Sequence, residues 1–284
     1  MKPLLLSAAL AAATSLSGLS AEAADYRRIV SIGGDVTEIV FALGEGDRLV
    51  ARDSTSTFPP EAKRLSDAGY MRALSAEGVL GTRPDAVLLS EGAGPPEQLQ
   101  ALKASGIPVE TVPEGHDAEA IQRKIEAVGR ALGKEQAAAA LADKVAADLE
   151  AATKEASRPA ADRKRVLFIL SLSDGKIIAA GDGSSADAML KLAGADNAVS
   201  GFKGYKALAP EAISRARPDA ILMMERSSHA AAADDLRANP AMADTPAVRS
   251  GAIIRMDGLT LLGFGPRTAQ AIRELSAALY GERS

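Results

Sequence analysis

A repeated segment constrains the fold of this 284-residue chain more than any other feature. Residues 73–91, ALSAEGVLGTRPDAVLLSE, recur without a gap as residues 207–225, ALAPEAISRARPDAILMME, and nine positions are identical. Ordinary composition would give about one or two matches over such a window. The offset of 134 residues is the size of a domain. The repeat therefore predicts two similar lobes, and two lobes imply a cleft between them.

Short apolar runs alternate with helical patterns along both halves of the chain. Strands are expected at residues 28–32, 49–51, 86–89 and 109–112, and then at residues 166–170, 177–180, 220–224 and 252–256. Helical patterns cover residues 36–43, 76–81 and 96–105, and a closing helix runs from Pro266 to Leu279. This alternation predicts an α/β fold with mostly parallel sheets covered by helices.

One long helix is expected between the two halves. Residues 134–156 are rich in Ala, Glu, Lys and Leu with almost no helix breakers. Leu141, Val145 and Leu149 follow each other at intervals of four, which places them on one apolar face. A helix of roughly 22 residues spans about 33 Å, so it would act as a strut. The expected organisation is an N-terminal lobe at 25–133, a connecting helix at 134–158 and a C-terminal lobe at 159–284.

The first 24 residues predict a secretory signal peptide. Lys2 precedes an apolar stretch from Leu4 to about Leu19, and the pattern Ala21-Glu22-Ala23 is typical of a cleavage site. Ser, Thr and Gly dilute this stretch, which is too weak for a membrane span of about 20 apolar residues. The chain has no cysteine, so a lipid-bearing Cys and disulfides are both excluded. We therefore expect a periplasmic monomer that is not anchored to the membrane.

Composition and motifs argue against several function classes. The formal net charge is −4 and there is no strongly basic cluster, so we do not expect the protein to bind nucleic acid. There is no G-x-S-x-G, no H-E-x-x-H and no cluster of His with carboxylates, so we do not expect an enzyme. Residues 181–186 match G-x-G-x-x-A, but the acidic residue expected about 20 positions later is missing. We interpret that turn as a helix N-terminus that faces the cleft.

Two loop segments and a terminal motif carry a family resemblance. Residues 53–61 read DSTSTFPPE, residues 65–75 read LSDAGYMRALS, and residues 263–268 read GFGPRT. Together with the export signal, they resemble the haemin-binding proteins of Gram-negative haem ABC importers, which are class III periplasmic binding proteins. The likeness covers essentially the whole mature chain, and it is most specific at GYMRALSAEG. It implies two Rossmann-like lobes with mostly parallel sheets, joined by a long rigid helix, and ferric haem b (protoporphyrin IX) carried in the cleft.

On this resemblance Tyr70 is the axial ligand of the haem iron. Ferric iron is a hard Lewis acid, and tyrosinate ligation of haem has a precedent in catalase. A free phenol ionises near pH 10, so binding at neutral pH requires the metal and a nearby cation. If the segment is extended, Arg72 points the same way as Tyr70, and its guanidinium would donate to the phenolate or to a haem propionate. Without the matching flanks, both side chains would more often lie in a solvated loop.

The second lobe offers further candidates for the cleft. Lys206 stands 134 residues after Arg72, so we expect it near a propionate together with Lys203, and we expect the adjacent Tyr205 to contact the haem as well. Arg226 directly follows the repeated strand, where strand ends face the crevice. The apolar side chains expected to cover the porphyrin faces are Met71, Leu259, Leu261, Leu262 and Phe264.

Histidine is scarce in this chain. Some members of the family place a His in the loop that here reads Ser171 to Gly175, so iron held by tyrosinate alone is the simpler expectation. His116 precedes a helix and is interpreted as a capping or surface residue, which leaves His229 as the other histidine considered near the cleft.

Glu77 and Glu211 occupy equivalent positions in the two copies of the repeat. Each is explained by the helix dipole, which favours an acidic residue in the first turn. The resemblance implies a second role, in which one acidic residue per lobe docks onto arginines of an inner-membrane ABC permease dimer. Two other functions stay open: a siderophore or corrinoid carrier on the same scaffold, and a structural or sensory module of the cell envelope that binds no tight ligand.

Overall fold

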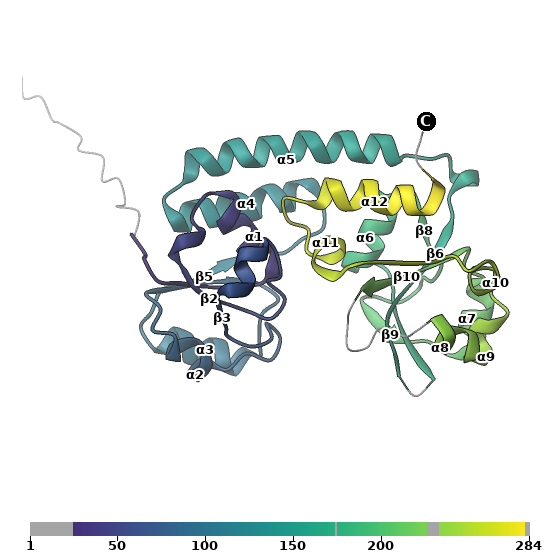
Figure 1. The fold of residues 1–284 in the computed structure, drawn as a ribbon, viewed down its shortest axis with the longest axis horizontal. Helices are drawn as coiled ribbons and strands as arrows, with labels where there is room; N and C mark the ends of the chain where they lie inside the picture. The colour runs from purple at the N-terminus through teal and green to yellow at the C-terminus, as the bar shows by residue number, and fades with distance from the viewer. Residues whose placement is uncertain (1–24, 174, 226–232, 282–284) are drawn as a thin grey trace, which may run out of the picture.

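The computed structural model describes residues 25–173, 175–225 and 233–281. It contains two β-sheets with their own helices, and the long helix α5 (Glu135–Ala156) runs along one side of both (Figure 1). We call the half built on the first sheet the N-lobe and the half built on the second sheet the C-lobe. The α/β fold expected from the alternation of strands and helices is confirmed.

The N-lobe sheet has five strands, and every pairing is parallel. Their order is β3 (Ser66–Asp67), β2 (Leu49–Arg52), β1 (Ile29–Ile32), β4 (Ala86–Ser90) and β5 (Val109–Val112). The central strands β1 and β4 are buried along their whole length, as parallel strands covered on both faces must be. The helices of this half are α1 (Gly34–Ala42), α2 (Ala76–Gly81), α3 (Pro96–Ala104) and α4 (Ala118–Leu132), with 3₁₀ turns at Gly46–Arg48 and Pro60–Arg64.

The C-lobe sheet is mixed. Its order is β11 (Ile253–Asp257), β10 (Ala220–Glu225), β6 (Arg165–Ser173), β7 (Lys176–Ala180) and β9 (Tyr205–Ala207), and β8 (Asp196–Asn197) also pairs with β6. The strand β7 runs antiparallel to both of its neighbours. A connection as short as the one between β6 and β7 permits only an antiparallel pair. The helices are α6 (Ser185–Leu192), α7 (Pro210–Ala216), α8 (Ala233–Ala238), α9 (Pro240–Ala243), α10 (Pro246–Ser250), α11 (Gly258–Leu262) and α12 (Thr268–Tyr280), with a 3₁₀ turn at Ala160–Asp162.

The two copies of the repeat fold alike. The first forms α2 and β4, and the second forms α7 and β10. The strand β4 pairs with β1, and β10 pairs with the equivalent central strand β6. Arg83 and Arg217, at the same place in each copy, both have left-handed backbone conformations, with φ of 53° and 41°. A residue before proline is excluded from continuing a right-handed helix. The Arg-Pro step therefore ends each helix and turns the chain into the next strand.

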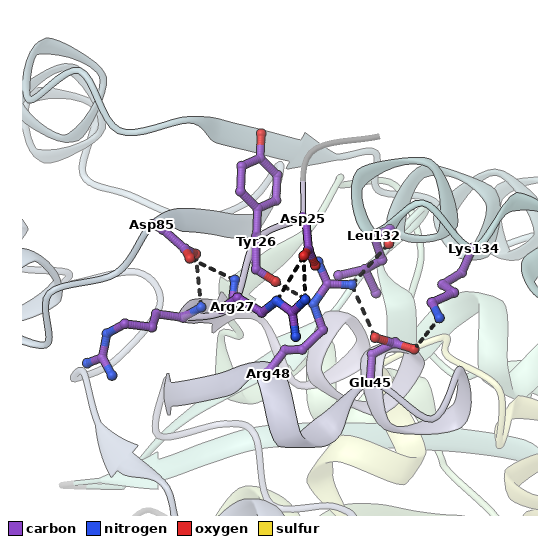
Figure 2. Close-up of polar contacts among 9 residues, drawn as sticks. Asp25, Tyr26, Arg27, Glu45, Arg48, Asp85, Leu132 and Lys134 are labelled. Carbon is purple, nitrogen blue, oxygen red and sulfur yellow. Dashed lines mark hydrogen bonds and ion pairs between the residues drawn. The ribbon is translucent and has the colours of Figure 1, made fainter. Parts of the chain in front are cut away.

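The aspartate that follows has the same structural role in both copies. The Asp85 carboxylate accepts hydrogen bonds from the backbone N–H groups of Arg27 and Arg28, at 2.7 and 3.0 Å (Figure 2). The Asp219 carboxylate accepts one from the backbone N–H of Arg165, at 2.8 Å. Each aspartate thus fixes the start of the central strand of its sheet.

The corner between α4 and α5 is held by an ionic cluster (Figure 2). Arg48 donates to the backbone oxygens of Tyr26 and Leu132, at 2.5 and 3.0 Å, and to Glu45 at 3.1 Å. Glu45 also pairs with Lys134 at 2.9 Å. The hydrogen bond from Lys134 holds the pKa of the Glu45 carboxyl below its ordinary value.

The helix α5 packs on α4 and on α12, so it is joined to both lobes. Its buried face is made mainly of small residues, and the two long side chains in it are Val145 and Leu149. A Cβ atom placed on Gly129 of α4 would lie 2.2 Å from the Cβ of Ala138, so α4 and α5 cross closely. The apolar core continues from the N-lobe under α5 to α12. The long helix expected between the halves is confirmed.

Two further expectations concern the signal peptide and a membrane-spanning helix. The signal peptide expected at residues 1–24 lies outside the described residues. Within the described ranges, none of the helices combines the length and the apolar character that a bilayer crossing needs.

Candidate ligand-binding cleft

A cleft of about 560 Å³ lies between the two lobes, within the range of roughly 300–1,000 Å³ that small-molecule sites occupy. The N-lobe side is lined by the end of β4 and by segments that follow β1, β2, β3 and β5, and the C-lobe side is lined by residues of β6, β9 and the end of β10 and by the segment from the end of β11 through α11. Ligands of α/β proteins bind at these carboxyl ends. The side chains that line the cleft include those of Lys63, Tyr70, Met71, Arg72, His116, Lys124, Leu170, Ser185, Tyr205, Met224, Leu259 and Leu262.

Tyr70 lies in this lining on a tightly held turn. Gly69 before it has φ of 99°, a conformation that favours glycine, and its carbonyl accepts from the backbone N–H of Ser54 at 2.8 Å. The carbonyl of Met71 after it accepts from the backbone N–H of Gly94 at 2.9 Å. Tyr70 is 48% exposed, one of two exposed large hydrophobic residues in the described part of the chain. Its ring is therefore available to a ligand although its backbone is fixed.

The segment around Tyr70 is a turn and not an extended strand. The backbone N–H of Ala73 donates to the carbonyl of Tyr70 at 2.8 Å. The premise that alternation of an extended chain would align Tyr70 with Arg72 is therefore wrong. Both side chains nevertheless line the cleft, together with Met71 between them, because the turn presents all three to it.

Lys206 is expected at the cleft, but the structure places it elsewhere. Its ammonium nitrogen lies 5.9 Å above the ring of Phe202, and it lines a separate hollow of the C-lobe surface. The neighbouring Tyr205 does line the cleft, and its hydroxyl is 3.0 Å from the hydroxyl of Ser185. Successive side chains of a strand point to opposite faces. Because Tyr205 of β9 faces the cleft, the next residue, Lys206, faces away from it.

Lys63 is a cleft residue that the sequence reasoning missed. It lies in the 3₁₀ turn at Pro60–Arg64, where an exposed lysine gives no signal that separates it from other surface lysines. Among the described residues that line the cleft, the cations are Lys63, Arg72 and Lys124, all on the N-lobe. Lys124 is paired with Asp35, whereas neither Lys63 nor Arg72 forms an ion pair within the described residues.

The C-lobe wall of the cleft is mixed. Its apolar side chains are Leu170, Met224, Leu259 and Leu262, and its polar ones are Ser185, Tyr205, Glu225 and Asp257. Two other residues expected there are buried instead: Leu261 is fully buried in the core, and Phe264 is only 1% exposed. The short helix α11 directs Leu259 and Leu262 to the cleft, and Leu261 on its other side joins the core.

His116 is part of the cleft and neither a cap nor a surface residue. The side chain that caps α4 is Asp117, which accepts from the backbone N–H of Ala120 at 2.7 Å. The imidazole of His116 lines the cleft and meets the ring of Phe264 edge to face, with 4.9 Å between ring centres. Burial, with the nearby charge of Lys124, lowers the pKa of His116 below its ordinary value. No sequence pattern indicates this position of His116, because Phe264 is far away along the chain.

The other candidate residues fall in two groups. Arg226 and His229 lie outside the described residues. Glu77 and Glu211 are exposed in the first turns of α2 and α7. These two helices lie on the side of the molecule opposite α5 (Figure 1).

Two α/β lobes, a long helix that joins them and a ligand-sized cleft at the ends of both sheets define a two-lobed binding protein. The model of the family described as periplasmic binding protein matches residues 29–259, and this chain belongs to that family.

Individual relatives narrow the comparison. The structure described as periplasmic heme-binding protein BhuT in complex with two hemes is 41% identical, covers 89% of this chain and 97% of that one, and has a TM-score of 0.82. The ABC transporter substrate-binding lipoprotein YvrC of Bacillus subtilis is 28% identical over 89% of this chain and 80% of its own length. The vitamin B12-binding protein of Yersinia pestis is 37% identical over only 34% of this chain and 33% of its own length.

Proposed function

We propose that this protein is a periplasmic carrier that binds ferric haem in the cleft and delivers it to an inner-membrane ABC importer. The observation that carries the proposal is the position of Tyr70. Its phenol is exposed in the wall of a ligand-sized cleft, on a backbone turn fixed by hydrogen bonds on both sides. A single exposed tyrosine is ordinary on a protein surface, so what points to a ligand is the place of this phenol in the wall of a cleft of ligand size.

The chemistry of a phenol suits the iron of ferric haem. Phenolate is a hard anionic oxygen donor, and Tyr ligation of haem iron has a precedent in catalase. A cation that lies close to the oxygen favours the anionic form. Arg72, two residues after Tyr70 and in the same cleft lining, is the nearest candidate for that role. We propose Tyr70 as the iron ligand and Arg72 as its supporting cation.

The rest of the cleft suits an amphipathic porphyrin. Haem has two apolar faces and two anionic propionates, so its carrier needs an apolar wall and cations at one edge. Leu170, Met224 and Leu262 supply apolar surface on the C-lobe. Lys63, which is exposed and forms no ion pair within the described residues, is placed to meet a propionate.

The relatives support haem over the other cargoes. BhuT, a haem-binding protein by its description, resembles this chain over nearly its full length, whereas the vitamin B12-binding protein matches over a third. A corrinoid brings its own ligands to the metal and would leave the exposed phenol of Tyr70 unexplained. The described residues also contain no group of three or more His, Cys, Asp and Glu side chains that could hold a bare metal ion.

The importer is the proposed partner. YvrC is described as a substrate-binding lipoprotein of an ABC transporter. Glu77 and Glu211 place one exposed carboxylate on each lobe, on helices that lie on the same side of the molecule. Such a pair matches a permease dimer that presents one cationic patch per subunit. We propose these two residues as the docking contacts.

Titration of the purified protein with haemin tests the proposal. We expect a high-spin ferric spectrum of the tyrosinate type, and its loss in Tyr70→Phe with an affinity at least about 10-fold lower, since even outer-shell partners of metal sites contribute 10–100-fold. Tyr26→Phe makes the same chemical change away from the cleft and should bind normally. Unchanged haemin binding by Tyr70→Phe would remove Tyr70 as ligand. The same titration gives the ratio of haem to protein, and a parallel one with cyanocobalamin tests the corrinoid alternative.

A further inference from the structure

The GFGPRT segment of the C-lobe, residues 263–268, forms hydrogen bonds with the N-lobe beside the cleft. We define the interlobe clasp by the residues that meet there, which are Asp35, Glu38 and Lys124 of the N-lobe and Gly263, Phe264 and Arg267 of the C-lobe. We propose that Lys124 is a positioning residue whose hydrogen bonds to both lobes fix the separation of the two cleft walls. This inference goes beyond the proposed function and does not depend on which ligand binds.

Lys124 is a buried cation shared between the lobes. Its side chain is 4% exposed, and its ammonium nitrogen lies 2.6 Å from a carboxylate oxygen of Asp35 in the same lobe. The same nitrogen lies 3.2 Å from the carbonyl oxygen of Gly263 and 3.4 Å from that of Phe264, both in the other lobe. An ammonium group has three donors, and all three are used. Separation of the lobes would remove two of the three acceptors from a buried charge, which is strongly unfavourable.

The two lobes also pack closely where Gly34 of the N-lobe meets Leu259 of the C-lobe. A Cβ atom on Gly34 would lie 2.4 Å from a methyl carbon of Leu259 and 2.9 Å from the carbonyl oxygen of Thr55. Phe264 has φ of 49°, which is unfavourable for a residue with a side chain. Such a conformation persists only where the surroundings impose it. The surroundings here are the carbonyl contact to Lys124 and the ring contact to His116, both from the N-lobe.

Arg267 forms a second tie from the C-lobe to the N-lobe. Its backbone N–H and its Nε donate to the two carboxylate oxygens of Glu38, at 3.1 and 3.0 Å. Its Nη1 donates to the hydroxyl of Thr260 at 2.7 Å, and its guanidinium carbon lies 3.7 Å from the centre of the Phe58 ring. Glu38 is 95% buried, since its exposed fraction is 5%. Arg267 is therefore bound both by Thr260 of its own lobe and by Glu38 of α1 in the N-lobe.

The clasp lies where it controls the width of the cleft. Asp35, Lys124 and Gly263 line the cleft themselves, so the two walls meet at the shared ammonium group. On the far side of this contact, α5 packs on α4 and α12. The lobes are thus joined at two separate places, and a hinge motion about one of them would be opposed by the other.

Distance measurement between the lobes by pulsed electron spin resonance tests the proposal. The chain contains no cysteine, so two introduced ones, Lys103→Cys on α3 and Ser214→Cys on α7, would be the only labelled sites. Both positions are exposed. We expect one narrow distance distribution without ligand, and a shift of less than about 2 Å when haemin is added, as in preorganised complexes.

Removal of the shared ammonium in Lys124→Met should move or broaden the distribution by more than about 2 Å. Arg48→Met is the matched control, because it removes a cation of similar burial whose partners all lie in the N-lobe, and it should lower the melting temperature without a change of distance. If Lys124→Met does not fold, Gly34→Ala decides the test, because its methyl group would push the two walls apart at Leu259, beside the Asp35 that binds Lys124. An unchanged distribution in the folded clasp variant, or a haemin-induced shift above about 2 Å in the unsubstituted protein, would overturn the proposal.

The distances are first measured without ligand, so a failure to bind haemin contradicts the carrier function and leaves this test intact.

Discussion

Tyr205 and Lys206 are neighbours in β9 and belong to different surfaces. The hydroxyl of Tyr205 lies 3.0 Å from that of Ser185 in the cleft lining, whereas the ammonium of Lys206 lies 5.9 Å above Phe202 on the outside of the C-lobe. The anionic edge of a ligand in the cleft would therefore meet Lys63 and Arg72 and would not meet Lys206.

Lys63→Ala should weaken haemin binding, and Lys206→Ala should leave it unchanged. Lys63 is exposed, and exposed ion pairs contribute about 0.2–1 kcal/mol, which corresponds to a loss of about 1.4- to 5-fold in affinity. The loss should shrink at high salt because salt screens exposed charges. Haemin titrations at low and high ionic strength check both variants. Equal effects of the two substitutions would contradict the placement of Lys63 in the cleft.

Glu77→Ala combined with Glu211→Ala should slow association with the importer and leave haemin binding intact. Charges at the edge of an interface act mainly on the association rate, and we expect a decrease of about 10-fold for the double variant. Binding to the importer in nanodiscs, followed by surface plasmon resonance, measures this rate. Glu97→Ala is the control, since Glu97 is an exposed acid in the first turn of α3. An association rate equal to that of the unsubstituted protein would rule out docking through these carboxylates.

Glu45→Gln should destabilise the protein at neutral pH and lose its effect in acid. The hydrogen bond from Lys134 lowers the pKa of Glu45 below 4.5, so this carboxylate stabilises the folded state above that pH. The contribution is lost as the pH falls through the pKa of the folded state. We expect a decrease of about 1–3 kcal/mol in the free energy of unfolding at pH 7.

Urea denaturation between pH 3 and pH 7 measures this dependence on pH. Glu119→Gln is the comparison, because Glu119 is exposed and its nearest cation, Arg123, is 3.8 Å away. That change should cost less than about 0.5 kcal/mol. A difference between Glu45→Gln and the unsubstituted protein that stays constant with pH would contradict the assignment.

Gly129→Ala should destabilise the crossing of α4 and α5. The added methyl group would lie 2.2 Å from the Cβ of Ala138, and overpacking costs about 1–3 kcal/mol. Alanine gains about 1 kcal/mol over glycine in helix propensity, so the expected net loss is at most about 2 kcal/mol. Gly78→Ala in α2, whose new methyl group would meet nothing closer than 3.6 Å, should be neutral or stabilising. Thermal unfolding of the two variants distinguishes these outcomes.

The fold was predictable from the sequence because its signals are long. The repeat extends over whole supersecondary units, and the helix α5 over 22 residues, so tertiary contacts do not override either pattern. The strands β3, β8 and β9 were missed because they have two or three residues, too few to show a period of two.

The lining of the cleft was only partly predictable, and β9 shows why. The ungapped repeat aligns Tyr70 with Gly204, yet the tyrosine that lines the cleft in the C-lobe is Tyr205, one residue later. Each tyrosine follows a glycine with positive φ, 99° at Gly69 and 70° at Gly204. A shift of one residue exchanges the two faces of a strand. The repeat therefore identified the neighbourhood of the second wall and assigned the wrong side chain to it.

The distribution of charge in the cleft has a consequence for unloading. Among the described residues, the phenol of Tyr70 and the unpaired cations Lys63 and Arg72 belong to one half of the molecule, and the other half offers apolar side chains together with the acids Glu225 and Asp257. A transporter that separates the two halves would remove the apolar and acidic side chains of the C-lobe and would leave these cations in place. The ligand would then remain bound to the N-lobe, and its release would require competition for its contacts with Tyr70, Lys63 and Arg72.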